Sequence, residues 1–174
     1  MSQPDKIITD YPPELKLILA CCSNENYNRG ELLPDPDYKR LMSLIARHRV
    51  LPVVHRYLSQ NNDLFPAEIS GKIRSGMERI TRRSVFLTSE LLETGKKLDE
   101  AGIKWFTMKG PVLSFLLYGS ISARDYRDID IYVLPEQFVD THRILINTGY
   151  HYTHKISPEK ISAVNHNAEY IKKI

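Results

Sequence analysis

Two aspartates in the second half of the chain have the spacing of paired metal ligands. Asp128 and Asp130 alternate with isoleucines in a segment, residues 128–134, whose pattern predicts a β-strand. Side chains two residues apart on a strand point to the same face, about 6–7 Å apart. Carboxylates at that spacing can hold one Mg²⁺ or a pair of ions about 4 Å apart. The same Asp-x-Asp pattern also occurs on strand faces and in turns that bind no metal. The neighbouring elements are therefore needed to tell a metal site from a chance pair.

A glycine-containing turn lies one predicted strand earlier. Residues 104–108 read as a strand, which passes through Lys109 and Gly110 directly into a helix opened by Pro111. A glycine lets backbone approach a ligand closely, and the free N–H groups of a first helical turn suit a phosphate, to which Lys109 adds a positive charge. Such a turn is also an ordinary chain reversal. Because the turn and the aspartates belong to consecutive strands of a βαβ-like unit, we expect them to meet at one crevice.

The elements that position these residues change character near Gly102. Before it, the sequence predicts a series of helices. The first begins at Pro12 and Pro13, and the second has Asp35 as its cap before Pro36. Pro52 and Pro66 begin the next two. The residues expected to face the core are Leu15, Ile18, Leu19 and Cys22 in the first helix, Leu41, Leu44 and Ile45 in the second, and Ile69, Ile73, Met77, Ile80, Leu87, Leu91 and Leu98 in the long helix after Pro66. The basic residues of that long helix are expected on its solvated side: Lys72, Arg74, Arg79, Arg82 and Arg83.

The later residues alternate between strand and helix. The loop 119–128 leads into the aspartate strand, a helix opened by Pro135 runs to about residue 147, and a third strand is expected over residues 150–154. A short helix after Ser157 and a last strand near the end complete the order. This pattern predicts a helical region over residues 1–100 and a small mixed-sheet core over residues 101–174.

Composition narrows the class of protein. The 174 residues are 42% hydrophobic and 26% charged, with a net charge of +3, which suits a globular protein with an anionic partner and does not predict a nucleic-acid binder. No apolar run is long enough to span a membrane, and the polar start lacks a secretory signal, so we expect a cytoplasmic protein. Cys21 and Cys22 are adjacent in a helical segment, where we expect buried, reduced thiols.

The stretch IKWFTMKGPVLSFLLYGSISARDYRDIDIYV resembles the nucleotidyltransferase superfamily that includes DNA polymerase beta and aminoglycoside nucleotidyltransferases. More closely, it resembles an uncharacterised bacterial nucleotidyltransferase family with a Lys-Gly, Tyr and Arg-x-x-x-Asp-x-Asp signature, which is matched by Lys109, Gly110, Tyr118, Arg124, Asp128 and Asp130. The upstream YKRLMSLIARHRVLPVV resembles the helical lead-in of that family, so the resemblance covers the chain from about Tyr38 onward.

The resemblance implies an α+β fold with a nucleotidyltransferase core and a two-metal transfer site. Asp128 and Asp130 would hold Mg²⁺ or Mn²⁺, and the turn at Lys109 and Gly110 would cradle the phosphates of a nucleoside triphosphate. Arg124 would meet a phosphate or order the loop, with a structural salt bridge as the alternative. A second register, in which Gly119 and Ser120 form the phosphate turn, leaves little room for a helix before the aspartates, and we prefer the turn at Gly110.

The superfamily carries a third carboxylate on a later strand, and Glu169 is the late candidate here. The segment HNAEYIKKI resembles the strand before the one that bears this acid, so we expect the core to be truncated at its C-terminus. The function implied is magnesium-dependent transfer of a nucleoside monophosphate to an acceptor that the sequence does not identify. Two alternatives remain open: a non-catalytic binding or regulatory module of the same fold, and a glycosyltransferase whose Asp-x-Asp motif holds a metal on a nucleotide-sugar. The helical first hundred residues are unlike the beginning of a glycosyltransferase fold.

Overall fold

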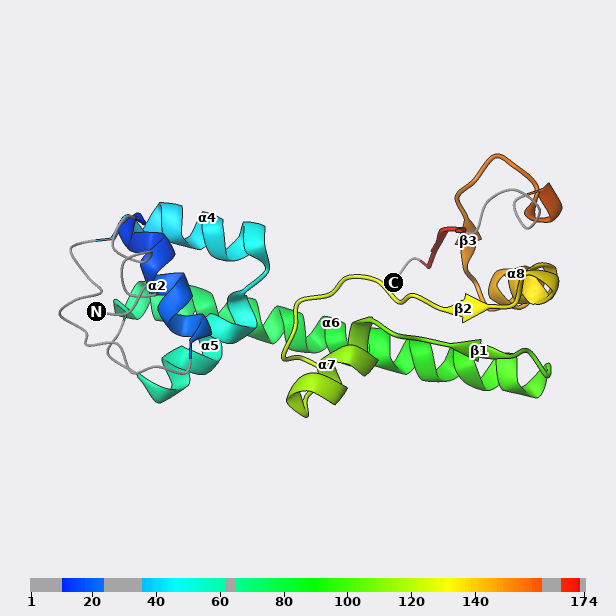
Figure 1. The fold of residues 1–174 in the computed structure, drawn as a ribbon, viewed down its shortest axis with the longest axis horizontal. Coiled ribbons are helices and arrows are strands. Elements are labelled where there is room, and N and C mark those ends of the chain that lie inside the picture. Colours follow the sequence, from blue (N-terminus) through cyan, green and yellow to red (C-terminus); the bar gives the residue numbers. More distant parts are fainter. Residues whose placement is uncertain (1–10, 24–35, 62–64, 161–166, 173–174) are drawn as a thin grey trace, which may run out of the picture. The chain divides into compact units, whose positions relative to one another are not determined.

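The computed structural model describes residues 11–23, 36–61, 65–160 and 167–172 (Figure 1). The chain divides into two compact units: Met1–Ser84 with Ser114–Tyr126, and Val85–Leu113 with Arg127–Ile174. Helices come first and short strands follow, so the α+β class and the order of elements predicted from the sequence are confirmed. The boundary predicted at residue 100, between a helical region and a sheet core, stays a prediction.

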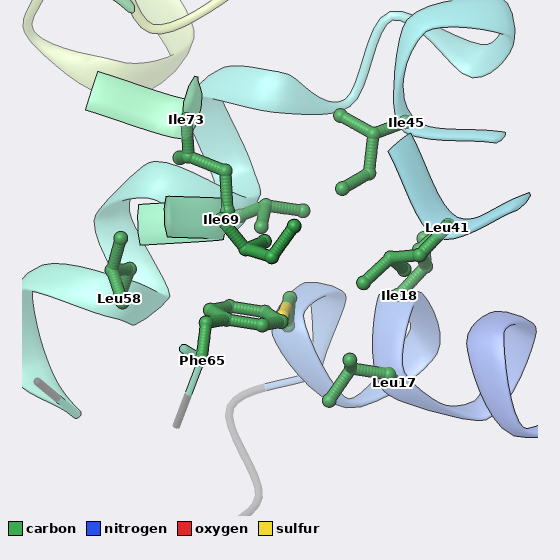
Figure 2. Packing of buried hydrophobic residues seen from close by; sticks show 10 residues of the cluster. Leu17, Ile18, Leu41, Ile45, Leu58, Phe65, Ile69 and Ile73 are labelled. Carbon is green, nitrogen blue, oxygen red and sulfur yellow. The ribbon is translucent and has the colours of Figure 1, made fainter. Parts of the chain in front are cut away.

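The core of the first unit is made by helices that pack their apolar faces together. These are α2 (Pro13–Cys22), α4 (Tyr38–His48), α5 (Leu51–Gln60) and the beginning of α6 (Ala67–Glu100). Figure 2 shows their buried side chains in one cluster together with Phe65, which precedes α6; the cluster consists of Leu17, Ile18, Cys21, Leu41, Ile45, Val54, Leu58, Phe65, Ile69 and Ile73. Burial of a large aliphatic or aromatic side chain contributes about 1.5–3 kcal/mol, so the cluster explains why these helices form together.

The face that α2 buries differs from the predicted one. Leu17, Ile18 and Cys21 are buried. The predicted residues that are only half-buried or exposed are Leu15, Leu19 and Cys22. Apolar residues cover most of this helix, so its spacing fits more than one face and the neighbouring helices decide between them. Both cysteines are free thiols, and one of the two is buried, not both.

Asp37, and not Asp35, caps α4. The Oδ1 atom of Asp37 accepts hydrogen bonds from the backbone N–H groups of Lys39 and Arg40, at 2.9 and 3.0 Å. The N–H of Asp37 itself donates to Oε1 of Glu14, a buried carboxylate on α2, at 3.0 Å. An aspartate of either position suits an N-cap, and α4 begins at Tyr38, directly after Asp37. Asp35 lies outside the described residues.

The long helix predicted after Pro66 is confirmed as α6, which has 34 residues. Its inward face buries Ile69, Ile73, Ile80, Leu91 and Leu98. Four of the five basic residues predicted on its solvated side are exposed: Lys72, Arg74, Arg79 and Arg82. Arg83 differs, because its guanidinium pairs with Asp125 and its Nε donates to the backbone oxygen of Tyr126 at 3.0 Å. The placement of Arg83 on the solvated side is therefore wrong.

Two antiparallel strand pairs are described in the second unit. They are β1 (Trp105–Phe106) with β2 (Tyr132–Val133), and β3 (His151–Tyr152) with β4 (Tyr170–Ile171). α7 (Gly110–Tyr118) lies between β1 and β2 in the sequence, so the predicted strand-helix-strand order is confirmed, but the two strands pair antiparallel and do not form the parallel pair of a βαβ unit. Alternation of apolar and polar residues shows which face each side chain takes, but it does not show the direction in which a strand pairs.

The helix predicted from Pro135 is confirmed as a short 3₁₀ turn, η1 (Pro135–Gln137), that continues into α8 (Phe138–Asn147). Beyond β4, Lys172 places its ammonium 2.8 Å from Oε2 of Glu90, a buried carboxylate on α6 that also accepts from the hydroxyl of Tyr150 at 2.8 Å. A buried carboxylate needs such partners, so Glu90 ties the end of the chain to α6. None of the described helices is long and apolar enough to cross a membrane.

Candidate active site

The antiparallel register brings the Lys-Gly turn and the aspartate pair to the same end of β1 and β2 (green and yellow in Figure 1). Lys109 follows β1 in the sequence, and Asp130 precedes β2. Because the two strands run in opposite directions, the residues after β1 lie beside the residues before β2. In a parallel pair, the end of β1 would lie beside the end of β2, near Leu134 and away from the aspartates. The Nζ atom of Lys109 lies 3.7 Å from Oδ2 of Asp130. These two motifs therefore meet, by an arrangement other than the predicted one.

The ion pair between Lys109 and Asp130 is exposed to solvent, with side-chain exposures of 63% and 39%. An exposed pair of this kind contributes about 0–1 kcal/mol, so it does not hold the strands together. Its weakness matters chemically, because the two groups can exchange partners at little cost. The carboxylate is free to turn to a cation and the ammonium to an anion, without loss of a buried interaction.

Gly110 begins α7 with a left-handed backbone, at a φ of +60°, and is buried. A residue with a Cβ is strained in this region by about 1–2 kcal/mol, so the turn needs glycine for its backbone conformation. The first turn of α7 carries backbone N–H groups without intrahelical partners and the positive end of the helix dipole. Lys109 and this turn together present positive charge beside the aspartates.

The alternative turn at Gly119 and Ser120 has the opposite polarity. Gly119 follows the last residue of α7 with a φ of +68°, and its N–H donates to the carbonyl oxygen of Phe115 at 2.8 Å. This is the usual role of glycine at a helix C-terminus. The backbone oxygen of Ser120 accepts from the hydroxyl of Ser114 at 2.7 Å. A helix C-terminus bears partial negative charge, which is unsuited to a phosphate, so the geometry favours Gly110.

The two aspartates lie just before β2 in residues that the structure does not assign to a strand. Asp128 is exposed, Asp130 is half-buried, and the neighbouring Ile129 and Ile131 are half-buried. The predicted strand is thus much shorter than residues 128–134, since regular pairing with β1 covers Tyr132 and Val133. That both carboxylates share one face and one ion stays a prediction.

Arg124 lies in the loop that precedes the aspartates, and that loop belongs to the first unit. Its side chain is half-buried. The salt bridge of this loop is made by its neighbour Asp125 with Arg83. Tyr126 is buried, and its hydroxyl donates to the backbone oxygen of Ile121 at 2.8 Å. The interactions of Arg83, Asp125 and Tyr126 fix the loop up to two residues before Asp128. Sequence reasoning missed Asp125 and Tyr126 and placed Arg83 on the solvated side.

Within the described ranges, no group of three or more His, Cys, Asp or Glu side chains is placed to hold a metal ion. Glu169, the late candidate for a third carboxylate, is exposed and lies beside β4. Its backbone N–H donates to Nε2 of His154 at 3.0 Å, and its backbone oxygen accepts from the N–H of Thr153 at 3.2 Å. Glu169 thus belongs to the β3–β4 pair and not to β1 and β2.

A glycine inside α6 positions β1, and sequence reasoning missed it. A Cβ added to Gly95 would lie 2.3 Å from Cζ2 of Trp105, so the indole ring packs directly on the helix at this position. The indole Nε1 donates to Oδ1 of Asp99, one turn further along, at 2.8 Å. A glycine in a helix interior is unfavourable by itself, which is the signal that could have revealed a close contact.

Comparison with protein families shows which family the chain belongs to. The model of a family described as "Uncharacterised nucleotidyltransferase" matches residues 34–173. The chain belongs to this family of nucleotidyltransferases. The match covers the helical lead-in as well as the segment with Lys109, Gly110 and the aspartates, in agreement with the resemblance seen from Tyr38 onward. Searches of curated proteins and of solved structures returned no match.

Proposed function

We propose that this nucleotidyltransferase uses Mg²⁺ or Mn²⁺, held by Asp128 and Asp130, to transfer a nucleoside monophosphate from a nucleoside triphosphate to an acceptor hydroxyl. The reaction class follows from the family match, which covers most of the chain. The observation that carries the assignment of the site is the 3.7 Å approach of Lys109 Nζ to Asp130 Oδ2, because it joins a cationic phosphate turn to a carboxylate pair. The glycosyltransferase alternative is not retained, since the matched family is one of nucleotidyltransferases.

The residues at this end of the strands fit a hard divalent cation. Carboxylate oxygens are preferred ligands of Mg²⁺ and Mn²⁺, and solvent access to Asp128 and Asp130 leaves room for water and phosphate oxygens to complete the shell. A bound ion would neutralise phosphate charge and make the α-phosphorus more electrophilic. It would also remove the repulsion between the two carboxylates.

The remaining residues have roles toward the triphosphate. Lys109 turns from Asp130 to a phosphate oxygen, and the N–H groups of the first turn of α7, which begins at Gly110, donate hydrogen bonds to other phosphate oxygens. Arg124 orders the loop or contacts a phosphate. These groups fix the triphosphate so that an acceptor oxygen meets the α-phosphorus in line with the departing pyrophosphate.

The transfer itself needs no covalent intermediate on the enzyme. The acceptor oxygen forms a bond to the α-phosphorus as the bond to pyrophosphate breaks, and the hydroxyl proton passes to a base. A third carboxylate would be that base, and among the described residues none joins Asp128 and Asp130. This observation favours a second candidate, in which the chain binds a metal-nucleotide complex without turnover, as a binding or regulatory module.

Pyrophosphate release from the four ribonucleoside triphosphates, with Mg²⁺ and a panel of hydroxyl-bearing acceptors, tests the proposal. We expect slow release that Asp130→Asn abolishes. Asp140→Asn removes an exposed acid of the same unit, on α8, and should leave the rate unchanged. Asp130-dependent nucleotide binding without any release would favour the non-catalytic module. Release that persists in Asp128→Asn/Asp130→Asn protein would contradict the assignment of the site.

A further inference from the structure

Two aromatic side chains form an exposed stack beside the candidate site. Phe106 and Tyr132 are directly opposite each other in the β1–β2 register, with ring centroids 4.9 Å apart and ring planes 11° apart. They are 55% and 38% exposed, and Met108, two residues after Phe106, is 60% exposed. Large aromatic side chains usually bury their area, so an exposed stacked pair with an apolar neighbour indicates a surface that meets something flat and apolar.

The stack lies next to the charged pair along both chain segments. Tyr132 follows Asp130 by two residues and Phe106 precedes Lys109 by three, so about 7–10 Å of extended chain separates each ring from the charged pair. Trp105, the residue before Phe106, packs against Gly95 of α6. The exposed charged pair of Lys109 and Asp130 is therefore followed, within a few residues on both segments, by the exposed aromatic pair.

We propose that Phe106 and Tyr132 bind the base of the nucleoside triphosphate. This inference rests on the function proposed above, with the phosphates at Lys109, Gly110 and the aspartates. A nucleotide carries its charge at one end and a flat, weakly polar ring at the other, with the ribose between them. The two segments have the same order: the charged pair, about 7–10 Å of chain, then the stacked rings.

The chemistry of the stack fixes what it contributes. Base-aromatic stacking strengthens binding by roughly five- to a hundredfold per base, and it is tolerant of sequence because every base has a π-face. Phe106 has no hydrogen-bonding group, so its contribution is affinity for a base rather than choice among bases. The stack therefore separates nucleotides from inorganic polyphosphate, which binds to the charged end alone.

Titration of the 174-residue chain with Mn²⁺-ATP and with Mn²⁺-tripolyphosphate tests this inference. Phe106→Leu keeps an apolar side chain but removes the planar face, and it should weaken Mn²⁺-ATP binding by roughly five- to a hundredfold while leaving Mn²⁺-tripolyphosphate binding unchanged. Tyr132→Leu should act in the same way. Phe115→Leu is the matched control, since Phe115 is 58% exposed on α7 and lies outside the stack. Circular dichroism melts confirm that each variant folds.

The outcomes separate this inference from the proposed function. If tripolyphosphate and ATP bind equally tightly and Phe106→Leu changes neither, the stack does not bind the base, whereas the metal-phosphate site remains. If Phe106→Leu weakens both ligands equally, the ring supports the fold of the site and does not contact the base, which also overturns the inference. If neither ligand depends on Asp128 and Asp130, the proposed function fails and the inference fails with it.

Discussion

Replacement of Gly95 by alanine should displace Trp105 from α6. The new Cβ would lie 2.3 Å from Cζ2 and 2.6 Å from Cη2 of the indole, far inside van der Waals contact, so the ring must move. Overpacking of this kind costs about 1–3 kcal/mol. Loss of the 2.8 Å hydrogen bond from the indole to Asp99 adds about 1 kcal/mol. Alanine is more favourable than glycine in a helix interior by about 1 kcal/mol, which offsets part of this loss. The net destabilisation is about 1–3 kcal/mol.

Gly71→Ala is the matched control for this prediction. Gly71 lies in the same helix with nothing within 4 Å of an added Cβ, so alanine there should stabilise the protein by about 0.5–1 kcal/mol. Urea unfolding, followed by circular dichroism, gives both changes. Trp105 is the one tryptophan of the sequence, so its fluorescence reports directly on the displaced ring. Equal stabilisation by both substitutions, with unchanged native fluorescence, would refute the packing of Trp105 on Gly95.

Three further predictions follow from the local geometry. Gly110→Val should lower the free energy of unfolding by about 1–2 kcal/mol, and Gly110→Asn by less, because asparagine tolerates the left-handed backbone at φ +60°; thermal melts should show this order. Arg83→Met should cost about 1–3 kcal/mol, since it leaves the largely buried Asp125 without its partner, and a double-mutant cycle with Asp125→Asn should show coupling between the two residues. Burial raises the pKa of Cys21 from 9.0 to about 12, so iodoacetamide should modify the exposed Cys22 first. Above pH 9.0 the Cys21 thiol ionises in the unfolded chain but stays neutral in the folded one. The stability that the neutral thiol contributes is therefore complete below pH 9.0 and is lost as the pH rises to about 12. Urea titrations at successive pH values should show this loss of stability in the unmodified protein and not in Cys21→Ala.

The helices could be predicted from the sequence because their signals are local. Proline at the first turn located α2 and α5, and the 3.6-residue period located α6. The errors arose where a distant partner decides. Asp37, the cap of α4, also donates its backbone N–H to Glu14 of another helix, a contact with no local signal in the sequence. Arg83 leaves the solvated side because Asp125, 42 residues later, takes its guanidinium.

The candidate site shows the same division between local and distant signals. The alternation around Asp130 and the glycine after Lys109 were visible in the sequence. The structure places the side chains of Lys109 and Asp130 together. The antiparallel pairing was not visible, because alternation carries no information on strand direction. The stacking of Phe106 on Tyr132 follows from that register, so it could not be predicted before the pairing was known.

Calorimetric titration with Mn²⁺ is the most direct test of the central assignment. The unmodified chain should bind Mn²⁺, and Asp128→Asn/Asp130→Asn protein should not, although its metal-free thermal stability should be equal or higher because the repulsion between the carboxylates is gone. Asp140→Asn, which removes an exposed acid from α8, should bind as the unmodified chain does. Unchanged Mn²⁺ binding in the double variant would contradict the metal site at Asp128 and Asp130, and with it the proposed mechanism.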